Sequence, residues 1–532
     1  MPSAEVILGL LLAVVVLTTV ARRLGVAYPI PLVLGGLVLG FLPGVPAVGL
    51  PPELVLVLFL PPLLYWESLN LSYRDLRAGL RPILGLAVGL VLATIAAVAV
   101  VAHAVLPGFT WATAFVLGAI VGPTDEVAAT AIAARLPLPA RLLALIEDES
   151  LLNDASSLVA YNVAVGAVVT GAFSLLGTGV RVLADAGGGI AIGLAVGWGV
   201  AQVRRRLDDP PVENTISLLT GFAAYLPAAA LQLSGVLAVV ACGLFLSRQA
   251  PRVVSPRTRL QGQEMWEIVD FLLNGVLFVL VGLQLHRILG TLAPDRAGTL
   301  LLDAGIIVLT VVVLRVVWVF AFASLPRRPL PTWGATRPRA PWQETAVVAW
   351  TGMRGAVSLA AALAVPLAIS GGAGFPQRDI IIYLTFAVIL ATLVPQGLTL
   401  PIMIRRLGIA PGPGEQHEEL AARLAATQAG LERLNSAAWD GVPRDLIDGL
   451  RTQLQDRSRR FVARANRSQS RAQRTEAARY RRLLREVLDA ERGALIDLRD
   501  QDIISDDVMR RVGRELDLDE ARLEPEDGDG PR

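Results

Sequence analysis

The chain has 532 residues, of which 54% are hydrophobic and only 18% charged, and its mean hydropathy is +0.56. A soluble globular protein cannot bury that much apolar surface, so the composition predicts a membrane protein. The net charge of +2 gives no indication of nucleic-acid binding, and the single cysteine, Cys242, excludes a disulfide framework.

The first three-quarters of the chain is a series of apolar runs of roughly 20 residues, the length that a helix needs to cross about 30 Å of hydrocarbon. We count thirteen candidate spans, which begin near residues 6, 29, 53, 82, 111, 141, 180, 215, 234, 265, 299, 345 and 380. After the Pro-Gly stretch at 411–414 the sequence becomes polar. We therefore expect an all-α transmembrane domain over residues 1–410 and a cytoplasmic helical regulatory tail over residues 411–532, with a disordered end from Glu524.

The arginines of the loops predict the orientation. They concentrate on alternate loops, for example at Arg22 and Arg23, at 204–206 and at Arg405 and Arg406, and are scarce on the opposite loops. Because positively charged loops stay in the cytoplasm, the N-terminus is predicted outside and the charged tail inside.

Polar segments interrupt the fifth and the twelfth spans, at Gly122–Glu126 and at Thr351–Gly355. Thirteen spans divide as six, a linker span and six, so the two interruptions hold equivalent places in the two halves. Interrupted helices at matching positions are typical of an inverted-repeat transporter whose site lies near the membrane midplane. The sequence thus predicts two broken helices that cross.

The sixth span contains the densest set of polar residues, Glu147-Asp148-Glu149-Ser150-Leu151-Leu152-Asn153-Asp154. Charge inside a span is costly unless it is paired or solvated, so these carboxylates are candidates for a functional site. On a helix, Ser150, Asp154 and Ser157 share one face, and Glu149 and Asn153 form the neighbouring stripe. The helix can therefore offer oxygen ligands to a hard cation on one side and a carboxylate to an internal partner on the other. For Glu147 and Asp148, a position at the membrane interface is the simpler interpretation.

The interrupted spans supply the second half of the candidate site. Pro123 removes a helical hydrogen bond and frees nearby carbonyl groups, which water or a cation must satisfy, next to Thr124 and Asp125. In the twelfth span Arg354 lies between Gly352 and Gly355, and we expect it to pair with a carboxylate of the sixth span.

Three other spans carry charge. Glu67 ends an apolar run in the third span and either lies at the membrane interface or lines the ion path. In the tenth span Glu267, Asp270 and Asn274 share a face, where packing or the lining of a cavity is favoured over direct ion binding. Arg315, midway along the eleventh span, needs a partner, for which we expect Asp125.

These motifs resemble those of the monovalent cation/proton antiporters, in the branch of bacterial NhaP-type proteins and animal sodium/proton exchangers. The resemblance rests on Glu149-Ser150-Leu151-Leu152-Asn153-Asp154, on Thr124-Asp125 and on Gly352-Met353-Arg354-Gly355-Ala356, and it extends over the whole membrane domain. It implies a homodimer with a scaffold domain, a mobile core domain and alternating access. The implied activity is exchange of a monovalent cation, sodium first, with lithium and potassium open, for protons across a bacterial plasma membrane.

The resemblance also implies roles for single residues. Asp154 resembles the carboxylate that holds cation and proton in turn, with Ser150 and the Thr124 backbone as further ligands and Glu67 contributing through water. Asn153 resembles the residue that ties the sixth span to the broken fifth span near Asp125.

The resemblance further implies that Glu149 and Arg354 form a buried ion pair. Two positions depart from the family pattern. Glu126 stands where proline commonly follows Thr-Asp, and Asp148 stands where glycine commonly precedes Glu-Ser-Leu. Both add negative charge near the ion path, so we expect them to modulate ion selectivity and the pH range of exchange.

Three alternative functions can be compared with exchange. An intramembrane hydrolase is disfavoured because the sequence has neither Gly-x-Gly-Asp nor His-Glu-x-x-His, so we expect no enzyme activity and no cofactor. A sodium-coupled symporter of related fold would have an uncharged polar pocket in place of Arg354 and the carboxylates. A non-transporting membrane sensor built around the tail is the third alternative.

Overall fold

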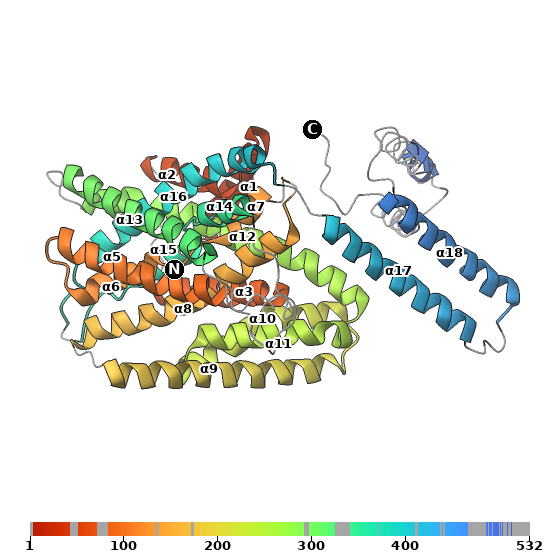
Figure 1. Cartoon of the computed structure of the whole chain (residues 1–532), viewed down its shortest axis with the longest axis horizontal. Helices are drawn as coiled ribbons and strands as arrows, with labels where there is room; N and C mark the ends of the chain where they lie inside the picture. Colours follow the sequence, from red (N-terminus) through yellow and green to blue (C-terminus); the bar gives the residue numbers. More distant parts are fainter. Residues whose placement is uncertain are drawn as a thin grey trace. The chain divides into compact units, whose positions relative to one another are not determined.

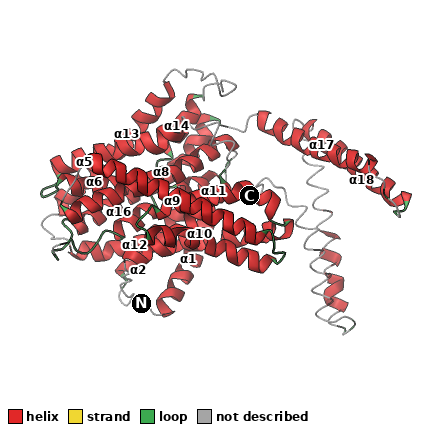
Figure 2. Cartoon of the chain, turned by 90° about the horizontal axis from the view of Figure 1, so that it is seen from below, coloured by secondary structure: helices red, strands yellow, loops and turns green. Residues whose placement is uncertain are grey.

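A computed structural model describes residues 4–42, 52–71, 83–133, 136, 138–171, 175–291, 297–324, 341–370, 372–409, 413–436, 439, 442–466 and scattered positions from 483 to 516. The chain divides into two compact units, Met1–Ala410 and Pro411–Arg532. Apart from one isolated bridge between Ala368 and Gly374, the described secondary structure consists of helices (Figure 2).

The first unit contains the helices in which the candidate site lies (Figure 1). They are α1 (Ala4–Leu24), α2 (Pro29–Phe41), α3 (Pro52–Asn70), the π-helix η1 (Gly85–Leu90), α5 (Val91–Val105), α6 (Trp111–Val121), α7 (Glu126–Ala133), α8 (Ala140–Thr170), α9 (Leu175–Arg204), α10 (Pro210–Ala230), α11 (Gly235–Val253), α12 (Pro256–Thr291), α13 (Ala297–Ser324), α14 (Trp342–Trp350), α15 (Ala356–Leu363) and α16 (Arg378–Leu407).

The first unit is an integral membrane domain. Eight of the described helices are long and apolar enough to cross a membrane, and α2, α6 and the Val55–Asn70 part of α3 are shorter and apolar. Large apolar side chains cover the outside, such as Leu183 on α9, which is 75% exposed. Lipid tails are the environment in which such a surface is stable. The count of thirteen spans and the inverted repeat stay predictions.

The interruptions fall where the sequence predicts them. α6 ends at Val121 and α7 begins at Glu126, while α14 ends at Trp350 and α15 begins at Ala356. Four half-helices therefore end or begin inside the unit, and each such end leaves backbone groups without helical partners. These backbone groups are available to bind the side chains of the site.

The two breaks lie in the interior of the unit, whereas other helices lie at its edge. The residues of the two breaks from Val121 to Thr124 and from Thr351 to Gly355 are buried, and α8 and α16 pack beside them. By contrast α9 lies at the edge of the unit, beside α10 and α11 (Figure 1). Close approach to α11 requires Gly193 on α9, because a Cβ atom there would lie 2.1 Å from the carbonyl oxygen of Ala238.

The second unit contains α17 (Pro413–Ser436) and α18 (Arg444–Asn466), which pack against each other. The guanidinium groups of Arg423 and Arg457 lie 5.4 and 5.7 Å from the ring centre of Phe461, a cation–π arrangement. A regulatory role for this unit stays a prediction, and its predicted disordered end lies outside the described residues.

Candidate functional site

The two breaks cross each other at Asp125. Its backbone N–H donates to the carbonyl of Met353 at 2.7 Å. Its carboxylate accepts from the backbone N–H of Val127 at 2.8 Å and from that of Ala356 at 3.1 Å, so a single side chain caps the N-termini of α7 and α15. A Cβ atom at Gly355 would lie 1.3 Å from a carboxylate oxygen of Asp125, so this crossing requires glycine. The negative carboxylate complements the positive ends of both half-helix dipoles.

Arginine supplies the opposite charge at the C-terminal ends. Nε of Arg354 donates to the carbonyl of Val121, the last residue of α6, at 3.1 Å, and its Nη1 donates to the carbonyl of Gly352. Its backbone N–H donates to Oγ1 of Thr392 on α16 at 3.1 Å. A cation at the end of α6 complements the negative end of that helix dipole. Within the described part of the chain, carbonyl oxygens rather than a carboxylate thus hold the guanidinium of Arg354.

The buried ion pair of the site joins α8 to α13. Nη1 of Arg315 lies 2.6 Å from Oε1 of Glu149, and both side chains are 2% exposed. Nη2 of Arg315 also donates to the carbonyl of Val348 in the last turn of α14, at 2.9 Å. Gly352 leaves room for this side chain, since a Cβ atom there would lie 2.1 Å from Cδ of Arg315.

This pairing corrects two expectations from the sequence. Glu149 pairs with Arg315 and not with Arg354, and Arg315 does not pair with Asp125. The reason is that each of the other two groups has backbone partners of its own: Asp125 accepts from two helix N-termini, and Arg354 donates to the carbonyls around the breaks. Arg354 remains within electrostatic range of both Glu149 and Arg315.

Three polar side chains fasten α8 to the first break. Oγ of Ser150 donates to the carbonyl of Thr124 at 2.7 Å, and Nδ2 of Asn153 donates to Oγ1 of Thr124, also at 2.7 Å. Farther along, the hydroxyl of Ser157 donates to the carbonyl of Ala119 on α6. All three side chains are buried. The predicted ligands Ser150 and Thr124 are thus in contact, and Asn153 ties the sixth span to the fifth as expected.

Asp154 lies on the same helix, one turn beyond Ser150. It is 4% exposed, and its Oδ1 is buried without a hydrogen-bond partner within the described part of the chain. Oδ1 of Asn153 and Oε2 of Glu67 are likewise buried and unpartnered. Asp154 interacts electrostatically with Glu67 and Asp125. The site therefore contains several acceptor oxygens that are open to a hydrogen-bond donor or a cation.

The family model that describes the transmembrane part of sodium/hydrogen exchangers matches residues 10–406. The chain belongs to the sodium/hydrogen exchanger family. This is a family of membrane transporters, and exchange of a cation for protons is the activity that its members share.

Related exchangers cover most of the chain. An uncharacterized Na⁺/H⁺ exchanger of Mycobacterium tuberculosis is 39% identical over 531 residues, 97% of this chain and 96% of the relative. The Na⁺/H⁺ antiporter ApNhaP of Aphanothece halophytica is 34% identical, with 77% of this chain and 76% of the relative covered. A sodium, potassium, lithium and rubidium/H⁺ antiporter of Bacillus pumilus is 35% identical, with 74% and 60% covered.

The fold of this exchanger is also that of a solved antiporter. The structure of the sodium proton antiporter MjNhaP1 from Methanocaldococcus jannaschii at pH 8 matches with a TM-score of 0.58 and 20% identity, over 75% of this chain and 100% of that chain. At this identity the likeness concerns the fold alone.

The remaining predicted residues of the exchanger lie around this centre. Asp148 is buried, while Glu126 begins α7 and its side chain lies outside the described residues. Glu67 on α3 interacts electrostatically with Asp270 on α12. Asp270 in turn accepts a hydrogen bond from Nδ2 of Asn274 at 2.8 Å.

Sequence reasoning missed the part played by Thr392, which accepts from the backbone of Arg354. A threonine inside an apolar span gives no signal of such a role. The charge of Arg315 in the middle of a span did mark it as needing a partner, but nothing in the sequence identified Glu149 as that partner.

Proposed function

We propose that this exchanger moves a monovalent cation, sodium first, against a proton, and that both compete for the carboxylate of Asp154. The single observation that carries the proposal is that Asp154 is almost fully buried while its Oδ1 has no partner in the described structure. A buried oxygen of this kind is costly unless a ligand satisfies it.

The neighbouring charges support this assignment because fixed partners already engage them. Glu149 is neutralised by Arg315, Asp125 is held by two backbone N–H groups, and Arg354 is held by carbonyls. Asp154 is left to exchange its ligand. When ionised it binds a cation, and when protonated it binds none, so the two ligands exclude each other.

The oxygens beside Asp154 are suited to a hard cation. Oδ1 of Asn153 has no partner among the described residues, and the hydroxyl of Ser150 on α8 lies against the carbonyl of Thr124 on the adjacent break. Hard cations prefer carboxylate, carbonyl, amide and hydroxyl oxygens. Glu67 adds a second carboxylate nearby and contributes through water. A single exchanging carboxylate favours one cation for one proton.

Alternating access follows from the same electrostatics. Asp154 that holds a proton or a cation is neutral and can be carried across, whereas the empty charged form is held back by its desolvation cost. The hydrogen bonds from Ser150, Asn153 and Ser157 make α8 move together with the break. We further propose a homodimer in a bacterial plasma membrane, with the N-terminus outside and the charged tail in the cytoplasm, as the loop arginines predict.

Proteoliposomes that contain a pH-sensitive dye test the proposal. Sodium, lithium or potassium is added in turn to full-length protein and to Asp154→Asn across the pH range. We expect cation-driven proton movement from the wild type and none from Asp154→Asn, because a neutral amide can neither release a proton nor neutralise a cation. Asp154→Glu should keep weak activity.

The matched control is Asp303→Asn on α13, a partly exposed aspartate outside the site, which should exchange like the wild type. Robust exchange by Asp154→Asn at matched protein levels would overturn the assignment. Responses to the individual cations distinguish a sodium-selective exchanger from a broad one, a point on which the related antiporters of Aphanothece halophytica and Bacillus pumilus differ.

A further inference from the structure

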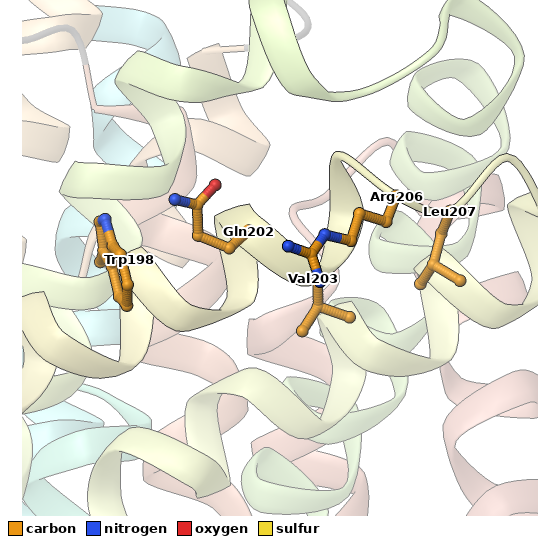
Figure 3. Close-up of a pocket in the computed structure, with 5 residues that line it drawn as sticks. All are labelled: Trp198, Gln202, Val203, Arg206 and Leu207. Atoms are coloured by element: carbon orange, nitrogen blue, oxygen red, sulfur yellow. The ribbon is translucent and has the colours of Figure 1, made fainter.

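A groove on the outside of the membrane domain lies at the C-terminal end of α9 and the turn that follows it, and no residue of the exchange site lines it. It has a volume of about 370 Å³ and is lined by Trp198, Gln202, Val203, Arg206 and Leu207 (Figure 3). Trp198 and Gln202 lie four residues apart on one stripe of α9, and Arg206 follows four residues later, in the turn after the helix ends at Arg204. The side chain of Arg206 runs back along the helix toward Gln202 (Figure 3).

The groove faces the surroundings of the protein at the edge of the bilayer. The apolar span on α9 runs from Gly179 to Arg204, and only 11% of an 18-residue window within it is buried. Trp198 is 60% exposed and Val203 is 50% exposed. From Trp198 to the end of α9 at Arg204 the helix rises by about 9 Å, and Arg206 lies two residues farther, so the lining residues can extend from the end of the hydrocarbon into a headgroup layer of roughly 5–8 Å.

The polar groups that line the groove are hydrogen-bond donors. Oε1 of Gln202 accepts from the guanidinium of Arg205 at 3.3 Å, which leaves the amide NH₂ of Gln202 to donate. The indole N–H of Trp198 and the guanidinium of Arg206 have no polar partner among the described residues. Three donors placed one after another along the groove suit a ligand rich in acceptor oxygens.

The nearby carboxylates do not neutralise this positive charge. Glu213 is buried and engaged by Arg204, with Nε and Oε2 3.9 Å apart. Asp209 accepts from the backbone N–H of Val212 at the start of α10. Neither lines the groove, and Asp208, which is exposed two residues from Arg206, forms no ion pair with it in the described part of the chain. The guanidinium of Arg206 is therefore the uncompensated charge of the groove, with an aromatic and an aliphatic surface beside it.

We propose that this groove binds the headgroup of an anionic phospholipid. The phosphodiester accepts hydrogen bonds from Arg206 and Gln202, and the first part of an acyl chain lies against Val203 and Trp198. A second copy of the chain fits less well, because a symmetric interface would bring two uncompensated Arg206 guanidinium groups together. A membrane supplies both the negative charge and the apolar chain that the groove complements.

The test is a titration of delipidated full-length protein with phosphatidylglycerol or phosphatidylcholine, followed by native mass spectrometry. We expect the wild type to bind phosphatidylglycerol more tightly than phosphatidylcholine. Arg206→Gln should weaken phosphatidylglycerol binding about ten-fold, as expected for the loss of a charged hydrogen bond. Arg206→Lys should keep part of the preference, and Trp198→Leu should weaken both lipids.

The matched control is Arg405→Gln, which removes an exposed arginine from the last turn of another apolar span and should bind as the wild type does. An unchanged preference in both Arg206→Gln and Trp198→Leu would overturn the proposal. Displacement of phosphatidylglycerol by millimolar inorganic phosphate would also overturn it in favour of a free anion. If the Arg206→Gln variant lost its dimer in pure phosphatidylcholine, the groove would instead be a contact with a second copy of the chain. None of these readouts requires transport, so the proposal can fail while the proposed exchange stands.

Discussion

The guanidinium of Arg315 on α13 lies 2.6 Å from the carboxylate of Glu149 on α8, and both side chains are almost completely enclosed. The same guanidinium reaches the end of α14 through the carbonyl of Val348. One side chain therefore connects three helices around the crossing. Because the pair is buried, its net contribution to stability is small compared with the cost of leaving either charge alone.

A double-mutant cycle on this pair follows directly. Glu149→Gln and Arg315→Gln should each lower the free energy of unfolding by about 3–5 kcal/mol, because each leaves an uncompensated buried charge. The double variant should recover much of that loss. Thermal unfolding of purified protein gives the loss in free energy of unfolding for each single variant and for the double variant. Expression level is compared alongside. The comparison cycle of Glu149→Gln with Arg354→Gln should show the weaker coupling; equal coupling would mean that both arginines share Glu149.

Gly355→Ala should disrupt the crossing. Its methyl group would occupy the position of the Asp125 carboxylate, which would have to leave the N-termini of α7 and α15. We expect loss of exchange and a stability loss of about 2 kcal/mol or more, the scale of a lost cap combined with overpacking. Gly305→Ala on α13, where an added methyl meets nothing within 4 Å, is the control. Normal flux and stability in Gly355→Ala would contradict the described geometry.

Glu67→Gln should reduce apparent cation affinity without abolishing exchange. Its carboxylate interacts with Asp154 across space, and a charge that acts through intervening water contributes roughly 1 kcal/mol, or about five-fold in affinity. Dye dequenching at increasing sodium concentration measures the half-saturating concentration. Glu267→Gln, an exposed carboxylate on α12, should leave it unchanged. Complete loss of exchange in Glu67→Gln would make Glu67 a direct ligand.

A chain that ends at Gly412 should still insert and exchange. The membrane unit contains the charged groups of the crossing, while α17 and α18 pack on each other. We expect flux in proteoliposomes with a shifted pH profile, compared with the full chain at equal protein. A monodisperse truncated protein with no flux at any pH would show that the tail is required.

The places where the chain leaves the helix could be predicted from the sequence, because glycine, proline and charge rarely occur together within an apolar run unless the helix is interrupted there. The breaks at Gly122–Glu126 and Thr351–Gly355 are of this kind, and they depend on local chemistry that adjacent residues specify. The contact of α8 with Thr124 joins residues that are 26 and 29 positions apart, and only the family resemblance of Ser150 and Asn153 implied it.

The choice between partners could not be predicted in the same way. Arg315 and Arg354 are both long, buried and positive, and which one meets Glu149 depends on how far α13 approaches across Gly352. That distance is a property of helix packing. The π-helix η1 is a similar case. Gly85 and Gly89 leave room for Phe322 and Trp318 of α13, and no local sequence pattern predicts the wider π-helical turn.

The sequence separation of the partners has a consequence for biosynthesis. Glu149 and Arg315 are 166 residues apart, and Asp125 and Ala356 are 231 residues apart. At roughly 5–20 residues per second, the ribosome needs on the order of ten to thirty seconds after Glu149 before Arg315 is made. During that interval α8 carries a charge that no later helix yet neutralises, so it must stay near water, take up a proton or remain with the insertion machinery. Closure of the core is therefore a late event that depends on the arrival of α13 and α15.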